Sequence, residues 1–267
     1  MSRIAWRSAA AAVVAAGCLV LVAACSSEKE DPNDPKNAAG CKADFAWSDG
    51  LSKLLSQTPA LQGGKPPTKA QLPQVQASYD KFVAGPLGEL EKNAPDELAD
   101  DVEKVVDASK QLRATGDAKP FESPALKATQ TTIAGYFYEE CSGEKAEVKG
   151  VDFAYEGVKA SYEVGEIRIK FRNEGKEVHE LVLVKKNPGV KESFDKLLEL
   201  PEEKATAKME FLGGEEAPPG EEAYVNADLT AGDYLMVCFV PQGSLPGKEG
   251  KGKPHFELGM KKELIVE

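Results

Sequence analysis

Two histidines, one cysteine and one methionine in the last third of this 267-residue chain are the residues that could hold a metal ion. His179 and His255 are the only histidines, Cys238 lies between them, and Met260 follows shortly after the second. Two imidazoles, a thiolate and a thioether form the ligand set of a blue copper site, with a trigonal His₂Cys plane and a weak axial Met. Thiolate favours Cu(I) and imidazole also suits Cu(II), so such a site supports one-electron transfer.

Each of these residues also has a simpler explanation. A lone histidine is usually a surface or hydrogen-bonded core residue, a buried cysteine often acts as a small apolar side chain, and Met260 could fill a gap in the core. The order of the four residues and the lack of other histidines favour the copper hypothesis. Met209 and Met236 fall within predicted strands, and we expect both to be packing residues.

The segment 147–267 has the pattern of a β-sandwich. Apolar residues alternate along it, and turn signals such as Asn173-Glu174-Gly175 separate the runs. Seven or eight short strands in about 120 residues predict an all-β Greek-key sandwich. His179 shares a strand face with Leu181 and Leu183, so we expect it to point into the core. We predict strands at 148–155, 159–162, 166–171, 178–184, 208–212, 223–227, 234–240 and 260–266, and a helical insertion near 189–200.

In order and setting these residues resemble the cupredoxins, the family of plastocyanin, pseudoazurin and rusticyanin. In that family the first ligand histidine follows an Asn-x-Gly turn, as in 173–179 here, and the cysteine ends the penultimate strand, as in 232–238. The second histidine and the methionine precede the last strand, as in 255–260. The resemblance covers about 148–267 and implies one type 1-like copper ion, with His179, Cys238 and His255 as equatorial ligands and Met260 as the axial ligand.

The spacing between Cys238 and His255 departs from the family pattern. Sixteen residues separate them, including four glycines and three prolines, where two to four residues are usual. Because loop-closure entropy grows only with the logarithm of length, this excursion (residues 239–254) could loop out and return His255 to the site. The other interpretation is that the ligand loop has drifted and copper is lost.

The segment 41–142 has helical periodicity and no histidine. We predict an all-α up-down-up-down four-helix bundle, with helices at 43–56, at 68–93 with a bend at Gly85-Pro86, from Pro95 to Gly116, and from the Ser123 cap to 141. In that topology Cys41 and Cys141 lie at the same end of the bundle. We therefore predict a disulfide between them and a free thiol at Cys238, the remaining cysteine.

The N-terminus has the features of a bacterial lipoprotein signal. Basic residues precede an Ala/Val/Leu stretch that ends in Val22-Ala23-Ala24-Cys25, which resembles a lipobox. We expect a signal peptide over 1–24, lipidation of Cys25 and a flexible tether over 25–40; an ordinary secretory signal is the alternative. The lipid anchor would hold the protein on the extracytoplasmic face of the cell membrane.

Composition narrows the function classes. The chain has 33 Lys and Arg against 44 Asp and Glu, a net charge of −11, which disfavours nucleic-acid binding. After residue 24 no apolar run is long enough to cross a bilayer, and no nucleophile–base pair or phosphate loop indicates an enzyme. We expect a monomeric one-electron carrier with a redox partner protein. The alternatives are a copper capture or delivery protein and a metal-free interaction module.

Overall fold

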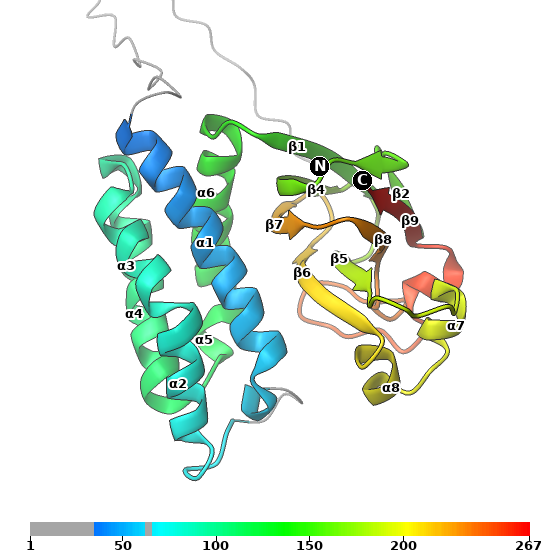
Figure 1. Cartoon of the computed structure of the whole chain (residues 1–267), viewed down its shortest axis with the longest axis horizontal. Helices are drawn as coiled ribbons and strands as arrows, with labels where there is room; N and C mark the ends of the chain where they lie inside the picture. The colour runs from blue at the N-terminus through cyan, green and yellow to red at the C-terminus, as the bar shows by residue number, and fades with distance from the viewer. Residues whose placement is uncertain (1–34, 62–65) are drawn as a thin grey trace, which may run out of the picture.

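A helical region precedes a two-sheet β-sandwich in this computed structural model, which describes residues 35–61 and 66–267 (Figure 1). The predicted signal peptide, the lipidation site Cys25 and most of the predicted tether lie outside the described residues. Among the described helices, none is long and apolar enough to cross a membrane.

The helical region differs from the four predicted helices. Its described part contains six α-helices: α1 Pro35–Gln57, α2 Leu72–Phe82, α3 Ala84–Asn93, α4 Ala99–Thr115, α5 Lys119–Glu122 and α6 Pro124–Glu140. The predicted helix 68–93 divides at Val83, just before the expected bend. Pro86 lacks an N–H and its ring would clash with the carbonyl four residues earlier, so it is accommodated only in the first turn of a new helix.

The starts of the first and last helices of this region can be compared with the predictions. Helix α1 begins at Pro35, inside the predicted tether, because proline suits a first helical turn and Asn37 is already buried. The Ser123 cap of α6 is confirmed, since its side chain accepts a hydrogen bond from the Leu126 N–H.

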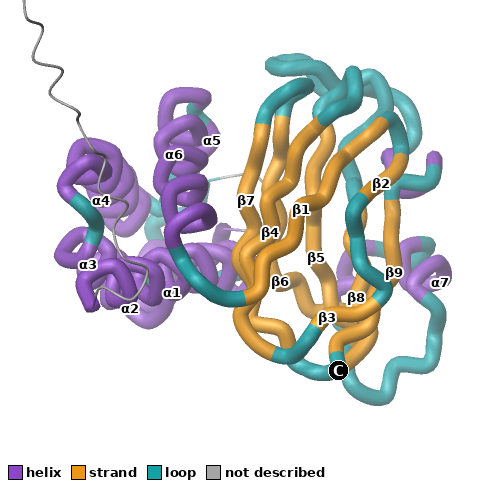
Figure 2. The backbone as a smooth tube through the Cα atoms, turned by 90° about the horizontal axis from the view of Figure 1, so that it is seen from above, coloured by secondary structure: helices purple, strands orange, loops and turns teal. Residues whose placement is uncertain are grey.

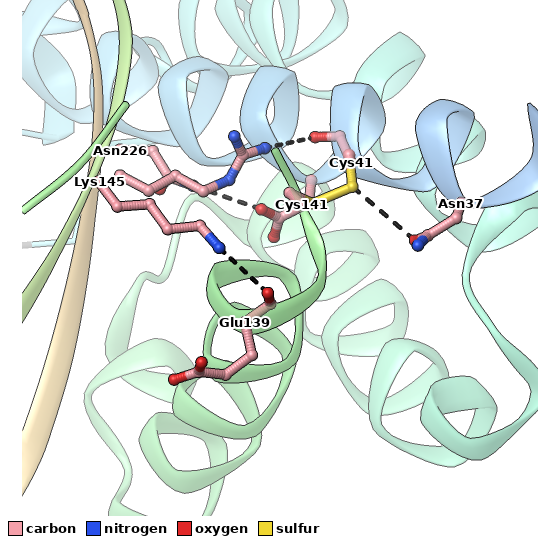
Figure 3. Close-up of a disulfide and its surroundings, with 8 residues drawn as sticks. Asn37, Cys41, Glu139, Cys141, Lys145 and Asn226 are labelled. Atoms are coloured by element: carbon pink, nitrogen blue, oxygen red, sulfur yellow. Dashed lines mark hydrogen bonds between the residues drawn. A yellow bond between two sulfur atoms is a disulfide. The ribbon is translucent and has the colours of Figure 1, made fainter. Parts of the chain in front are cut away.

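The predicted disulfide is confirmed (Figure 3). Cys41 in α1 and Cys141, directly after α6, are bonded, with their Cα atoms 5.7 Å apart. Cys238 is a free, buried thiol. The disulfide joins the first and last helices of the region at the point where the chain enters the sandwich.

The sandwich consists of two sheets. One has the strand order β2-β1-β4-β7 and the other β3-β9-β8-β5-β6. Neighbouring strands are antiparallel except β1 with β4 and β3 with β9. The Greek-key connection stays a prediction. The strands are β1 Glu144–Val151, β2 Ala154–Glu156, β3 Ser161–Tyr162, β4 Gly165–Asn173, β5 His179–Lys186, β6 Met209–Ala217, β7 Glu222–Leu229, β8 Gly232–Val237 and β9 Lys261–Val266.

All the strand bounds differ from the predicted ones by at least one residue, and the largest differences lie in two strands and the insertion. The predicted strand 148–155 is interrupted at Asp152 and Phe153, where Phe153 has φ of 64°, a left-handed conformation that costs a non-glycine residue roughly 1–2 kcal/mol. Strand β6 continues to Ala217, beyond the predicted end. The insertion forms two short helices, α7 Phe194–Leu198 and α8 Glu202–Thr206.

Strand β5 is buried on both faces. Leu181 and Leu183 face the core between the sheets, as predicted, together with Met236 of β8. Val182 and Val184 contribute to a second cluster under α7, which also includes Met209. Both methionines are buried packing residues, as expected. A strand covered on both sides gives the residue at its start a fixed position.

Helices α1 to α6 lie on one side of the sandwich (Figure 2), where α1 packs on β6 and β7 and α6 packs on β7 and β4. The Arg168 guanidinium on β4 donates to the Cys41 carbonyl at 2.8 Å and lies 5.3 Å from the centre of the Phe45 ring. Asn226 on β7 donates to the Asp44 carboxylate at 3.4 Å. Buried polar contacts therefore fix the helical region on the sheet.

Candidate metal centre

The four predicted ligands lie at one end of the sandwich. His179 is the first residue of β5, and Cys238 directly follows β8, which is antiparallel to β5. Met260 directly precedes β9, which pairs with β8 on its other side. Antiparallel pairing brings the start of one strand beside the end of its neighbour, so the topology gathers these residues at the same edge.

Three of the donor atoms form a buried cluster. His179 Nδ1 lies 2.9 Å from His255 Nδ1, and His255 Nδ1 lies 3.4 Å from Cys238 Sγ. One ligand atom from each residue lies within 4.8 Å of the others, and all three residues are fully buried. A metal ion with bonds of about 2.0–2.3 Å to nitrogen and sulfur fits a cluster of this size.

Met260 is held beside this cluster by its backbone. Its N–H donates to the His255 carbonyl at 3.0 Å, and its carbonyl accepts from the Cys238 N–H at 3.1 Å. The residue is fully buried in the core shared by Cys238 and Phe171. The Met260 backbone is thus hydrogen-bonded to two of the three residues of the cluster. This position suits an axial ligand.

Burial raises the pKa of the Cys238 thiol to about 12. The Glu180 N–H donates to Cys238 Sγ at 3.4 Å and partly offsets this effect. The Glu180 carboxylate accepts from the Phe239 N–H at 2.6 Å, so Glu180 contacts both the sulfur and the backbone that follows Cys238. A thiolate in this position near neutral pH requires a cation bonded to the sulfur.

The turn before β5 places His179. The Asn173 side chain accepts from the Gly175 N–H and donates to the carbonyls of Glu177 and Ala217. Gly175 is required here, since a Cβ at this position would lie 2.5 Å from His179 Nε2. Burial, with a smaller contribution from the nearby His255, lowers the pKa of His179 to about 4. The neutral ring keeps a lone pair for a metal.

The excursion between Cys238 and His255 is looped out, and its two ends meet. Pro241 and Pro254 form an antiparallel bridge, the His255 N–H donates to the Val240 carbonyl, and the Phe256 N–H donates to the Cys238 carbonyl. The intervening residues 242–253 form the loop between these two ends. Of the two interpretations of the long spacing, the structure therefore supports the one in which His255 returns to the site.

Three residues around the histidines were not identified from the sequence. The Phe153 ring contacts the His255 ring edge-on, with 4.9 Å between ring centroids. Glu177 Oε2 lies 3.1 Å from His255 Nε2. Asp152 Oδ1 lies 3.8 Å from His179 Nε2, too far for a hydrogen bond, so that buried nitrogen has no hydrogen-bond partner. No pattern in the sequence distinguished them, since Asp152 and Phe153 fall inside the predicted strand 148–155 and Glu177 directly precedes the strand predicted from 178.

Several solved structures of copper proteins resemble the C-terminal half of the chain. The reduced auracyanin of Roseiflexus castenholzii is 19% identical over 47% of this chain and 98% of its own, with a TM-score of 0.33. Auracyanin A of Chloroflexus aurantiacus, a "blue" copper protein, is 19% identical over 46% and 98%, with a TM-score of 0.32. Rusticyanin of Thiobacillus ferrooxidans is 20% identical over 48% and 80%, with a TM-score of 0.30.

These structures are what the C-terminal domain is similar to in fold. No protein-family model and no curated protein matches the chain. The chemistry of the site is therefore identified from its own donor atoms and not from these structures. Two imidazole nitrogens and one thiol sulfur converge in a buried cluster beside a methionine, and this is the donor set of a type 1 copper site.

Proposed function

We propose that the protein is a lipid-anchored, extracytoplasmic copper protein that carries single electrons. The observation that supports this most is the convergence of His179 Nδ1, His255 Nδ1 and Cys238 Sγ in a fully buried position. Bound copper would supply the one-electron couple. The protein would hold the three donors in one arrangement for both oxidation states, which reduces reorganisation on electron transfer.

Burial of the centre favours a carrier over the alternative of a copper capture or delivery protein. Both histidines and the cysteine have no solvent exposure, and the excursion closes beside them. A delivery protein must present its metal to a recipient, whereas a carrier needs only a short path for the electron. We propose no enzymatic reaction, because a substrate would not reach donor atoms that belong to fully buried residues.

Phe239 provides a covalent link from the centre to the surface. It directly follows Cys238, is 41% exposed, and contacts the Phe256 ring with 5.6 Å between centroids. Phe256 in turn directly follows His255. We propose that a redox partner protein docks at this aromatic pair while the lipid on Cys25 keeps the monomeric carrier at the membrane.

The test is a titration of the purified mature chain with Cu(II), followed by a redox titration. The proposal predicts one copper per chain, an intense visible charge-transfer band from the thiolate, and reversible bleaching on reduction. Tight Cu(I) binding without reversible cycling would favour the delivery alternative. A chain that takes up no copper would support the metal-free interaction module.

A further inference from the structure

The outer side of His255 is closed by the excursion. Val178 and Gln242 anchor this segment, since the Val178 N–H donates to the Ser244 carbonyl at 2.9 Å and the Gln242 N–H to the Lys253 carbonyl at 2.9 Å. Within the excursion the Ser244 hydroxyl accepts from the Gly250 N–H. The first half of the excursion is therefore held beside the residues that precede His179.

One carboxylate joins this segment to the His255 ring. Glu177 Oε2 accepts a hydrogen bond from the Gly243 N–H at 2.5 Å and lies 3.1 Å from His255 Nε2. The Glu177 backbone is itself fixed, because its carbonyl accepts from the Asn173 side chain. The Glu177 side chain is 21% exposed, so the carboxylate lies at the boundary between the buried cluster and solvent.

The two histidines differ in the hydrogen bonding of their Nε2 atoms. The Asp152 carboxylate lies 3.8 Å from His179 Nε2, beyond hydrogen-bond distance, whereas the Glu177 carboxylate lies 3.1 Å from His255 Nε2. A proton on His255 Nε2, donated to Glu177, leaves the lone pair on Nδ1, the atom that faces Cys238 and His179. The carboxylate thus selects the ring tautomer in which the inward nitrogen can bind metal.

We propose that Glu177 is a positioning residue that latches the excursion over the centre and orients His255 for the metal. Its negative charge next to a ligand ring would also favour Cu(II) over Cu(I) and so lower the reduction potential. The part that concerns copper rests on the proposed function, whereas the latch between Glu177, Gly243 and His255 does not.

Two variants separate the charge from the hydrogen bonds. Glu177→Gln removes the charge but keeps an acceptor oxygen, and Glu177→Ala removes both. Glu174→Gln is the matched control, since it removes the same charge from the same turn, and Glu174 pairs with Lys149 and Arg172 at the surface.

The first measurement needs no metal. Amide hydrogen exchange of Gly243 and the NMR signal of the His255 Nε2 proton are recorded in the mature chain. We expect Glu177→Ala to raise Gly243 exchange at least about 10-fold and to abolish the protected His255 proton, with no change in Glu174→Gln. Unchanged exchange and an unchanged histidine signal in Glu177→Ala would overturn the latch.

The second measurement uses the chain loaded with Cu(II) sulfate. We expect the midpoint potential to rise in both Glu177 variants and copper loss to a Cu(II) chelator to accelerate about 10- to 100-fold in Glu177→Ala. The same potential in wild type and both variants would overturn the role in tuning copper. A wild-type chain that binds no copper would refute the proposed function, while the metal-free measurement would still decide the latch.

Discussion

Replacing the buried carboxylate of Asp44 should make the protein more stable at alkaline pH. Asp44 lies between α1 and the sheet, is 1% exposed, and receives a hydrogen bond from Asn226. Burial raises its pKa from 3.8 to about 7, although the nearby Arg168 charge and the Asn226 hydrogen bond oppose the shift. Asp44→Asn keeps an acceptor oxygen for Asn226 and removes the ionisation.

The direction of the pH dependence follows from the proton that Asp44 binds in the folded state. Between pH 3.8 and about 7 the folded state holds a proton on Asp44 that the unfolded state has lost, so the free energy of unfolding falls as pH rises through this window. A shift of about three units at roughly 1.4 kcal/mol per unit corresponds to about 4 kcal/mol above pH 8. This value is an upper limit, because water entry and relaxation reduce the desolvation of a buried charge. Below pH 4 the two proteins should be equally stable.

Urea unfolding at pH 4, 6 and 8.5 measures the effect. Trp47 is a suitable probe, since it is buried near Asp44 and the only other tryptophan, Trp6, lies in the predicted signal peptide. The stability of Asp44→Asn relative to wild type should increase with pH by up to about 4 kcal/mol. The exposed Asp107→Asn should show no such trend. A pH-independent difference, or destabilisation by Asp44→Asn at pH 8.5, would refute the reasoning.

Four further variants test other parts of the structure. Cys238→Ser should abolish the visible copper band because it removes the thiolate. Met260→Leu should keep the band and change the midpoint potential. Absorption spectra and redox titration measure the two effects. Replacing both Cys41 and Cys141 by serine should lower the free energy of unfolding by about 4–5 kcal/mol, the chain-entropy value for a separation of 100 residues, and leave the band unchanged. If the basic loop 248–253 steers docking, replacing its lysines by glutamine should slow electron transfer to an acidic partner at low salt only. Equal rates in the variant and the wild type would show that the loop is a spacer.

The ligand residues could be predicted because strand periodicity and order carry the information. The alternation that places His179 with Leu181 and Leu183 fixes the face to which it points, and the position of Cys238 at the end of a strand places it at the same edge. The disulfide followed similarly from helix order and the odd number of cysteines.

The groups around the ligands could not be predicted, because their positions depend on loops. Glu177 reaches His255 only because residues 242–253 are looped out, and no local pattern encodes that closure. Phe153 contacts His255 from a left-handed backbone conformation that its residue type disfavours. The early start of α1 likewise depends on burial of Asn37, a tertiary effect in a segment of polar composition.

The most direct test of the account is a crystal structure of the mature chain grown with copper, with anomalous scattering measured at the copper absorption edge. The account predicts one strong anomalous peak bonded to His179 Nδ1, Cys238 Sγ and His255 Nδ1, with the Met260 sulfur on one side of their plane. A peak bound elsewhere, or no peak at this cluster in crystals that contain copper, would contradict it.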